Sequence, residues 1–159
     1  MTSFEFVPMP ESVADAVRRD RRDAFGNAAL RPIVVDKEAA YPCRVCLADA
    51  HVGERVYLFS YGPFEKAAPH QTVGPVYVHA TRCTPFRCSA RLPDVLRRRL
   101  VALRAYDAEG AELVECDILE GTAIEARAEK ILSNPRVHHI NVHFARAGCF
   151  ACTIERSAR

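Results

Sequence analysis

The chain has 159 residues, of which 49% are hydrophobic and 26% are charged. This length supports one ordinary hydrophobic core and is short for two, so we expect a single domain over residues 1–159. The 22 basic and 20 acidic residues leave a net charge of +2, which argues against nucleic acid as a partner, and no apolar stretch reaches the length of a membrane span, so we expect a cytoplasmic protein with no membrane partner.

The first element that the sequence predicts is a helix over residues 10–25. Pro10 and Glu11 open it, and Val13 and Val17 recur at helical spacing ahead of a basic end. The run RRDRR is compatible with a nucleic-acid patch, but acidic residues interrupt it, and such runs usually form a solvated helix face. We therefore expect residues 1–29 to be an N-terminal helical segment.

Strand signals dominate the rest of the chain. Short runs rich in β-branched and aromatic residues occupy residues 32–35, 56–61 and 76–78, and two further runs are HHINVHF and CFACTIER. An ordered loop over residues 62–74, a short helix from Pro93, a hairpin turn over residues 107–111 and a helix over residues 121–133 are predicted among them. The pattern predicts an α+β fold, with a mainly antiparallel sheet and two to three helices packed on it.

Two short motifs carry most of the chemical information. Cys43 and Cys46 form a C-x2-C pair, and His79 and Cys83 form an H-x3-C pair. Thiolate and imidazole are the ligands that tetrahedral Zn²⁺ prefers, and these spacings let neighbouring side chains bind one ion without straining the backbone. The odd number of cysteines, seven, fits reduced thiols or a metal better than a disulfide framework. The sequence therefore predicts Zn²⁺ as a cofactor.

A set of buried thiols beside a hydrogen-bonded histidine remains an alternative to the metal site. Cysteine often acts as a small core hydrophobe, and Cys43 and Cys46 would face opposite sides of a regular strand. A metal site requires a turn in this segment, which Pro42 favours because it restricts φ.

Other potential ligands remain in the sequence. The nearest spare ligands, should one of the four be wrong, are Cys88, His51 and His70. A second C-x2-C pair, Cys149 and Cys152, is compatible with an all-thiolate site, but Cys152 alternates with Phe150 and Ile154 as a core position does. We therefore rank this second pair below the Cys43, Cys46, His79 and Cys83 set.

A polar stripe on the strand HHINVHF is the second candidate site. His139, Asn141 and His143 lie on one face, and apolar residues lie on the other. The stripe is either a solvent-exposed sheet face or a ligand pocket, in which these side chains with Arg146 and Cys149 would meet an anionic or carbonyl-bearing molecule. A nucleophile and base pair of Cys149 and His143 is a further alternative, although no local signature supports it.

The chain resembles a known family over roughly residues 30–156. The runs YPCRVCLADAHVGERVYLFSYGPF, VGPVYVHATRC, LRRRLVALRAYDAEG and NPRVHHINVHFARAGCF occur in the order and spacing of the bacterial family catalogued as domain of unknown function 1203. Asn134 stands where Asp is common, and Phe150 stands where Tyr is common. The resemblance implies a small intracellular bacterial protein with no established reaction or substrate.

The resemblance also bears on the metal site. Some family members have Ser at the position of Cys46, and these also lack counterparts of His79 and Cys83, as loss of a shared metal would produce. This implies that the fold forms without the metal in some relatives. The block around Cys149 recurs more generally, so the resemblance implies a role for Cys149 that is independent of zinc.

Two classes of function follow from these observations. The first is a Zn²⁺-stabilised α+β module that binds a protein partner or a small molecule, in which four protein ligands close the coordination sphere. The second is an enzyme that uses the polar sheet face around Cys149 and His143, or a metal with one open position. The number of protein ligands on the metal distinguishes them, and we favour the first.

Overall fold

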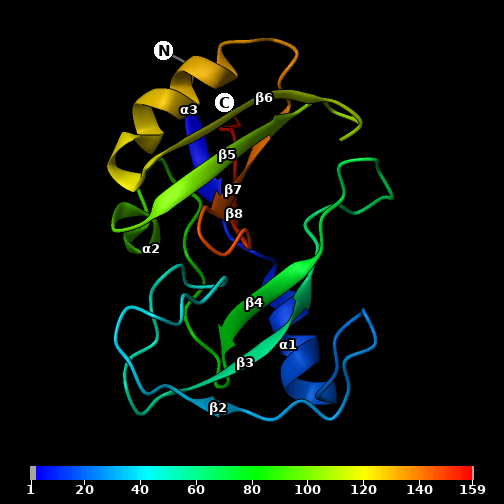
Figure 1. Ribbon diagram of the computed structural model, residues 1–159, viewed down its shortest axis with the longest axis vertical. Coiled ribbons are helices and arrows are strands. Elements are labelled where there is room, and N and C mark those ends of the chain that lie inside the picture. Colours follow the sequence, from blue (N-terminus) through cyan, green and yellow to red (C-terminus); the bar gives the residue numbers. More distant parts are fainter. Residues whose placement is uncertain (1–2, 159) are drawn as a thin grey trace.

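A computed structural model of the protein describes residues 3–158, which form two antiparallel sheets, one above the other in Figure 1. The strands are β1 (Phe4–Val7), β2 (Ile33–Val34), β3 (Arg55–Tyr61), β4 (Gly74–His79), β5 (Leu100–Tyr106), β6 (Leu113–Glu120), β7 (His139–Phe144) and β8 (Phe150–Arg156). The helices are α1 (Glu11–Asp20), α2 (Asp94–Arg97), α3 (Ile124–Leu132) and a 3-10 turn, η1 (Gly121–Ala123).

The larger sheet has the strand order β1-β8-β7-β5-β6, and α3 packs on it. The predicted hairpin is present, because β5 and β6 pair across the turn that contains Gly110, whose φ of 65° suits glycine. The prediction that the last two strands are neighbours is confirmed by the pairing of β7 with β8. Ile124, Ile131 and Leu132 are buried, as the helical periodicity predicted.

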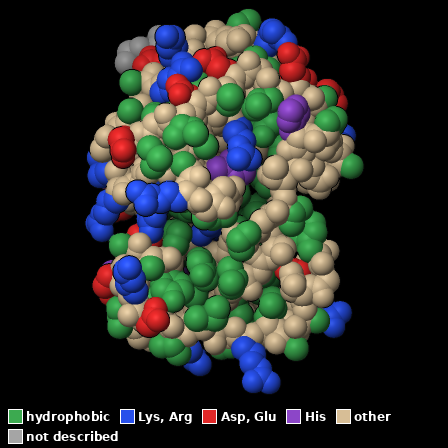
Figure 2. All heavy atoms as spheres, in the orientation of Figure 1, with side chains coloured by type: hydrophobic (Ala, Val, Ile, Leu, Met, Phe, Trp, Pro, Cys, Tyr) green, Lys and Arg blue, Asp and Glu red, His purple; other side chains and the backbone are tan. Residues whose placement is uncertain are grey.

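The smaller sheet has the order β2-β3-β4, and α1 packs on it. Ala14 and Val17 of α1 are buried in the same apolar cluster as Tyr57 and Val76, so the helical spacing seen in the sequence faces this second core. In Figure 2 the surface narrows between the two sheets, and Lys and Arg side chains gather beside the left end of this waist.

The α+β prediction is correct at the level of class, and three details differ. There are two sheets rather than one, and the first helix ends at Asp20 rather than at residue 25. The segment before residue 29 also contains β1, which pairs with β8 beside it in Figure 1. The four residues of this strand, FEFV, are too few to show a periodic pattern, so the sequence did not predict a strand whose partner lies at the other end of the chain. None of the helices in the described part of the chain is both long and apolar enough to cross a membrane.

Candidate functional site

The first cysteine pair lies on a tight turn, as a metal site requires. Pro42 pairs with Asp49, the Cys43 amide donates to the Ala48 carbonyl at 3.0 Å, and the Leu47 amide donates to the Cys43 carbonyl at 3.0 Å. Leu47 has a φ of 52°, a left-handed conformation that is unfavourable for a branched side chain. Its side chain is 2% exposed, so packing holds the turn in this shape.

The four predicted ligands come together around one point. The ligand atoms of Cys43, Cys46, His79 and Cys83 all lie within 4.8 Å of one another, so the group could hold a metal ion. The Sγ atoms of Cys43 and Cys83 are 3.8 Å apart, and Sγ of Cys46 is 3.6 Å from Nδ1 of His79. A tetrahedral ion with Zn–S of about 2.3 Å and Zn–N of about 2.0–2.1 Å gives S···S and S···N edges of about 3.8 and about 3.6 Å. The two separations match these edges, so the donor set is compatible with a tetrahedral ion such as Zn²⁺.

Neighbouring side chains orient this set. Nε2 of His79 lies 2.8 Å from a carboxylate oxygen of Glu54, which leaves Nδ1 to face the thiols. A carboxylate on the second nitrogen of a metal-binding imidazole is the usual arrangement, since it fixes the ring and its tautomer. Arg18 of α1 donates from Nε to the His79 carbonyl at 3.0 Å, and its terminal nitrogen lies 3.9 Å from Sγ of Cys83. A cation at this place suits a cluster of thiolates.

The crowding of the thiols perturbs their acid–base behaviour. The pKa of Cys43 is lowered, mainly by its hydrogen bond with Cys46 and next by that with Cys83. The pKa of Cys46 is raised, mainly by its hydrogen bond with Cys43. Hydrogen bonding to Cys43, followed by that to Cys83, raises the pKa of His79 to about 10. A metal ion bound here would need all three cysteines as thiolates, and its charge would stabilise them together.

The other potential ligands lie outside this cluster. Cys88 is exposed, and Nδ1 of His51 lies 3.0 Å from a Glu38 carboxylate oxygen. Cys152 is fully buried in the core of the larger sheet, so the second C-x2-C pair does not join the first. His70 packs on the ring of Tyr106, with 5.8 Å between the ring centroids.

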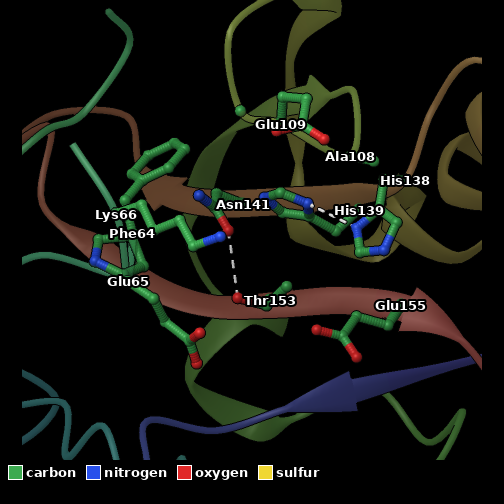
Figure 3. Close-up of a pocket in the computed structure, with 12 residues that line it drawn as sticks. Phe64, Glu65, Lys66, Ala108, Glu109, His138, His139, Asn141, Thr153 and Glu155 are labelled. Atoms are coloured by element: carbon green, nitrogen blue, oxygen red, sulfur yellow. Dashed lines mark hydrogen bonds between the residues drawn. The ribbon is translucent and has the colours of Figure 1, made fainter. Parts of the chain in front are cut away.

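Two residues of the polar stripe, His139 and Asn141, line a cavity of about 400 Å³ that we call cavity A. Figure 3 shows it, with side chains from β7 and β8 facing Phe64, Lys66 and the turn at Glu109. Asn141 is 2% exposed, and its Oδ1 accepts a hydrogen bond from Thr153 at 3.1 Å. Its Nδ2 has no partner among residues 3–158 and is free to donate into the cavity. At His139 and Asn141, the polar face of β7 therefore borders a cavity rather than open solvent.

His143 has a different environment. It is 1% exposed, and its Nδ1 lies 2.9 Å from the Gly148 carbonyl, so Nδ1 carries the proton. Burial lowers the pKa of His143 to about 4. Its Nε2 is buried without a hydrogen-bond partner among the described residues, so no hydrogen bond joins the basic nitrogen to the thiol of Cys149. These two side chains therefore do not form a hydrogen-bonded nucleophile and base pair.

Cys149 lines a second cavity, of about 500 Å³, that we call cavity B. Its Sγ accepts a hydrogen bond at 3.2 Å from Arg44, a residue between the two cysteines of the first motif. Arg44 is 2% exposed and also donates to the carbonyls of Pro42, at 2.5 Å, and Phe150, at 2.7 Å. The sequence carried no signal for this contact, because an arginine in a turn is usually exposed.

A family model described as "Protein of unknown function (DUF1203)" matches residues 40–156, which include all four metal-ligand candidates and the polar stripe. No curated protein matches the chain. No solved structure matches it either.

Proposed function

This chain belongs to the DUF1203 family, and we propose that it acts as a cytoplasmic, zinc-stabilised α+β module that binds a small polar molecule. The observation that carries the zinc part is the agreement between two ligand separations, 3.8 and 3.6 Å, and the edges of a tetrahedral Zn²⁺ site. The family description supplies no activity, so the proposal depends on the residues themselves.

Four protein ligands favour a structural role for the metal. Three cysteines and one histidine complete a tetrahedral sphere and leave no position for water or substrate, whereas hydrolytic zinc sites keep one position open. The ligands come from the turn at Cys43, the end of β4 and the loop after it. Zinc would therefore join the turn to the smaller sheet, while Arg18 links α1 to the same place.

Cavity A is the proposed binding site. Asn141 offers a donor from a buried position, with its oxygen already held by Thr153, so the orientation of its amide is set before a ligand arrives. His139 stacks on Tyr106 with 5.6 Å between the ring centroids, and burial, followed by the charge of His138, lowers its pKa. A neutral imidazole and an amide suit a ligand with both hydrogen-bond donors and acceptors.

Metal analysis tests the zinc part. Purified protein should contain close to one zinc per chain, and Cys46→Ser should lose it with a marked fall in melting temperature, since structural metal binding is coupled to folding. The matched control is Cys116→Ser, because Cys116 is exposed on β6 and outside the cluster, and it should keep its zinc. Metal-free protein with an unchanged melting temperature would contradict the proposal.

A thermal-shift panel of small carboxylates, amides, amines and sugars tests the binding part with zinc-loaded protein. A compound that occupies cavity A should raise the melting temperature of the native chain and not that of Asn141→Ala, which removes the buried donor. Zinc content is the control, because Asn141 is not a ligand and the variant should stay fully loaded. If every stabilising compound acts equally on both proteins, cavity A is not the binding site.

A further inference from the structure

Cavity B differs from cavity A in its charge. Three arginines line it, Arg98, Arg99 and Arg146, together with one acidic residue, Glu120. Arg99 is held by Asp49 through two contacts, of 2.6 and 3.1 Å. Arg98 and Arg146 are exposed and have no ion-pair partner among residues 3–158, so their charges are available to a ligand.

A buried positive charge lies behind the cavity wall. None of the three hydrogen-bond partners of Arg44 is a carboxylate: they are two carbonyls and Sγ of Cys149. The ring of Phe144, which lines the cavity, has the guanidinium of Arg44 at 5.0 Å from its centroid and that of Arg99 at 5.2 Å. A charge in a low-dielectric interior is poorly screened, so Arg44 adds to the positive potential of the cavity.

We propose that cavity B binds a small oxyanion-bearing molecule, with a phosphate or carboxylate group paired to Arg98 and Arg146 and with the sulfur of Cys149 at the cavity wall. Guanidinium groups match the planar, bidentate geometry of such groups. The volume of about 500 Å³ is in the range of sites for small metabolites. This site is separate from the zinc ligands and from cavity A, so it stands whether or not those proposals hold.

Cys149 provides a local reporter of the anion preference. Iodoacetate and iodoacetamide alkylate the same sulfur by displacing iodide, and they differ in that iodoacetate carries a negative charge. The ratio of the two rates at one cysteine therefore removes thiol ionisation from the comparison and reports the electrostatic attraction of the cavity. Rates at Cys149 are read by mass spectrometry of its peptide in the native protein as purified, with the exposed Cys88 and Cys116 as internal references.

The expected result is that Arg98→Gln with Arg146→Gln lowers the iodoacetate-to-iodoacetamide ratio at Cys149 by about threefold or more, and leaves the ratio at Cys88 unchanged. The matched control is Arg97→Gln, which removes an exposed arginine of α2 that does not line the cavity, and it should leave the ratio at Cys149 unchanged. Inorganic pyrophosphate should slow iodoacetamide labelling of Cys149 in the native protein and not in the double variant.

Three outcomes would overturn the proposal. The first is a ratio at Cys149 that the double variant does not change, because the arginines would then be ordinary solvated charges. The second is an equal effect of Arg97→Gln, which would show that net charge matters and the cavity does not. The third is a Cys149 that neither reagent reaches and a protein that binds no pyrophosphate by calorimetry.

Discussion

Replacement of His143 by Asn should make the protein less sensitive to mild acid. His143 is buried and neutral, with Nδ1–H donating to the Gly148 carbonyl and Nε2 without a partner among the described residues. Asn places a side-chain N–H near the position of Nδ1, so the hydrogen bond to Gly148 can be kept while the titrating ring is removed. Any packing loss in the variant does not depend on pH.

The magnitude follows from the depressed pKa. The pKa of His143 is about 4 in the folded chain, against 6.5 for an unperturbed histidine. As the pH falls, the unfolded chain therefore takes up a proton on this histidine before the folded chain does. The free energy of unfolding is unaffected by this group above pH 6.5 and falls between pH 6.5 and about 4. The total loss is about 3 kcal/mol, of which about 1.4 kcal/mol is lost by pH 5.5.

Urea unfolding at pH 7.5 and 5.5, with zinc in equal excess, measures this loss. The native chain should lose about 1.4 kcal/mol more than His143→Asn between the two pH values, since contributions of the metal ligands cancel in the difference. His51→Asn is a control of opposite sign, because the hydrogen bond to Glu38 raises the pKa of the exposed His51. The same acid dependence in the native chain and in His143→Asn would refute the reasoning.

Two further predictions concern the fold and the metal. Gly121→Ala should lower the free energy of unfolding in urea by more than about 3 kcal/mol, because an added Cβ would lie 1.7 Å from the Leu96 carbonyl oxygen. The control is Gly74→Ala, which has open space around the added Cβ and should change the free energy of unfolding by less than about 1 kcal/mol. Similar losses in the two variants would contradict the packing argument. Glu54→Ala should weaken zinc binding by about 10–100-fold in a chelator competition, since it removes the carboxylate that contacts Nε2 of His79. Glu38→Ala, which removes a carboxylate that contacts His51, should leave zinc affinity unchanged. Equal affinities of the two variants would show that the Glu54 carboxylate has no part in binding zinc.

Local patterns predicted the elements that depend on neighbouring residues. The alternation along β7 and the turn before β6 could be predicted from residues only a few positions apart in the sequence, and both elements are present. The helical stripe from Ile124 to Leu132 is buried for the same reason, since a side chain's direction is set by the period of its own element. Periodicity did not predict β1, whose four residues become a strand through pairing with β8.

The metal-ligand candidates lie between these cases. The spacing of Cys43 with Cys46, and of His79 with Cys83, predicted two pairs that can each supply two ligands to one ion. The fold brings the four ligand atoms within 4.8 Å of one another. The support from Glu54 and Arg18 was not predictable, because those contacts span 25 and 61 residues of chain. Short-range geometry is encoded in the motif, whereas the surrounding charges depend on the packing of α1 and β3.

By itself, the sequence determined the class of fold, the alternating strand β7 and the residues suited to bind a metal, since each depends on residue type and local period. Only the tertiary structure decided that His139 and Asn141 line one cavity and Cys149 another, with His143 buried. It also decided that Arg44 extends from the cysteine turn to Cys149, 105 residues away. Contacts of this kind depend on where loops and sheets pack against one another, and no periodicity along the chain records that packing.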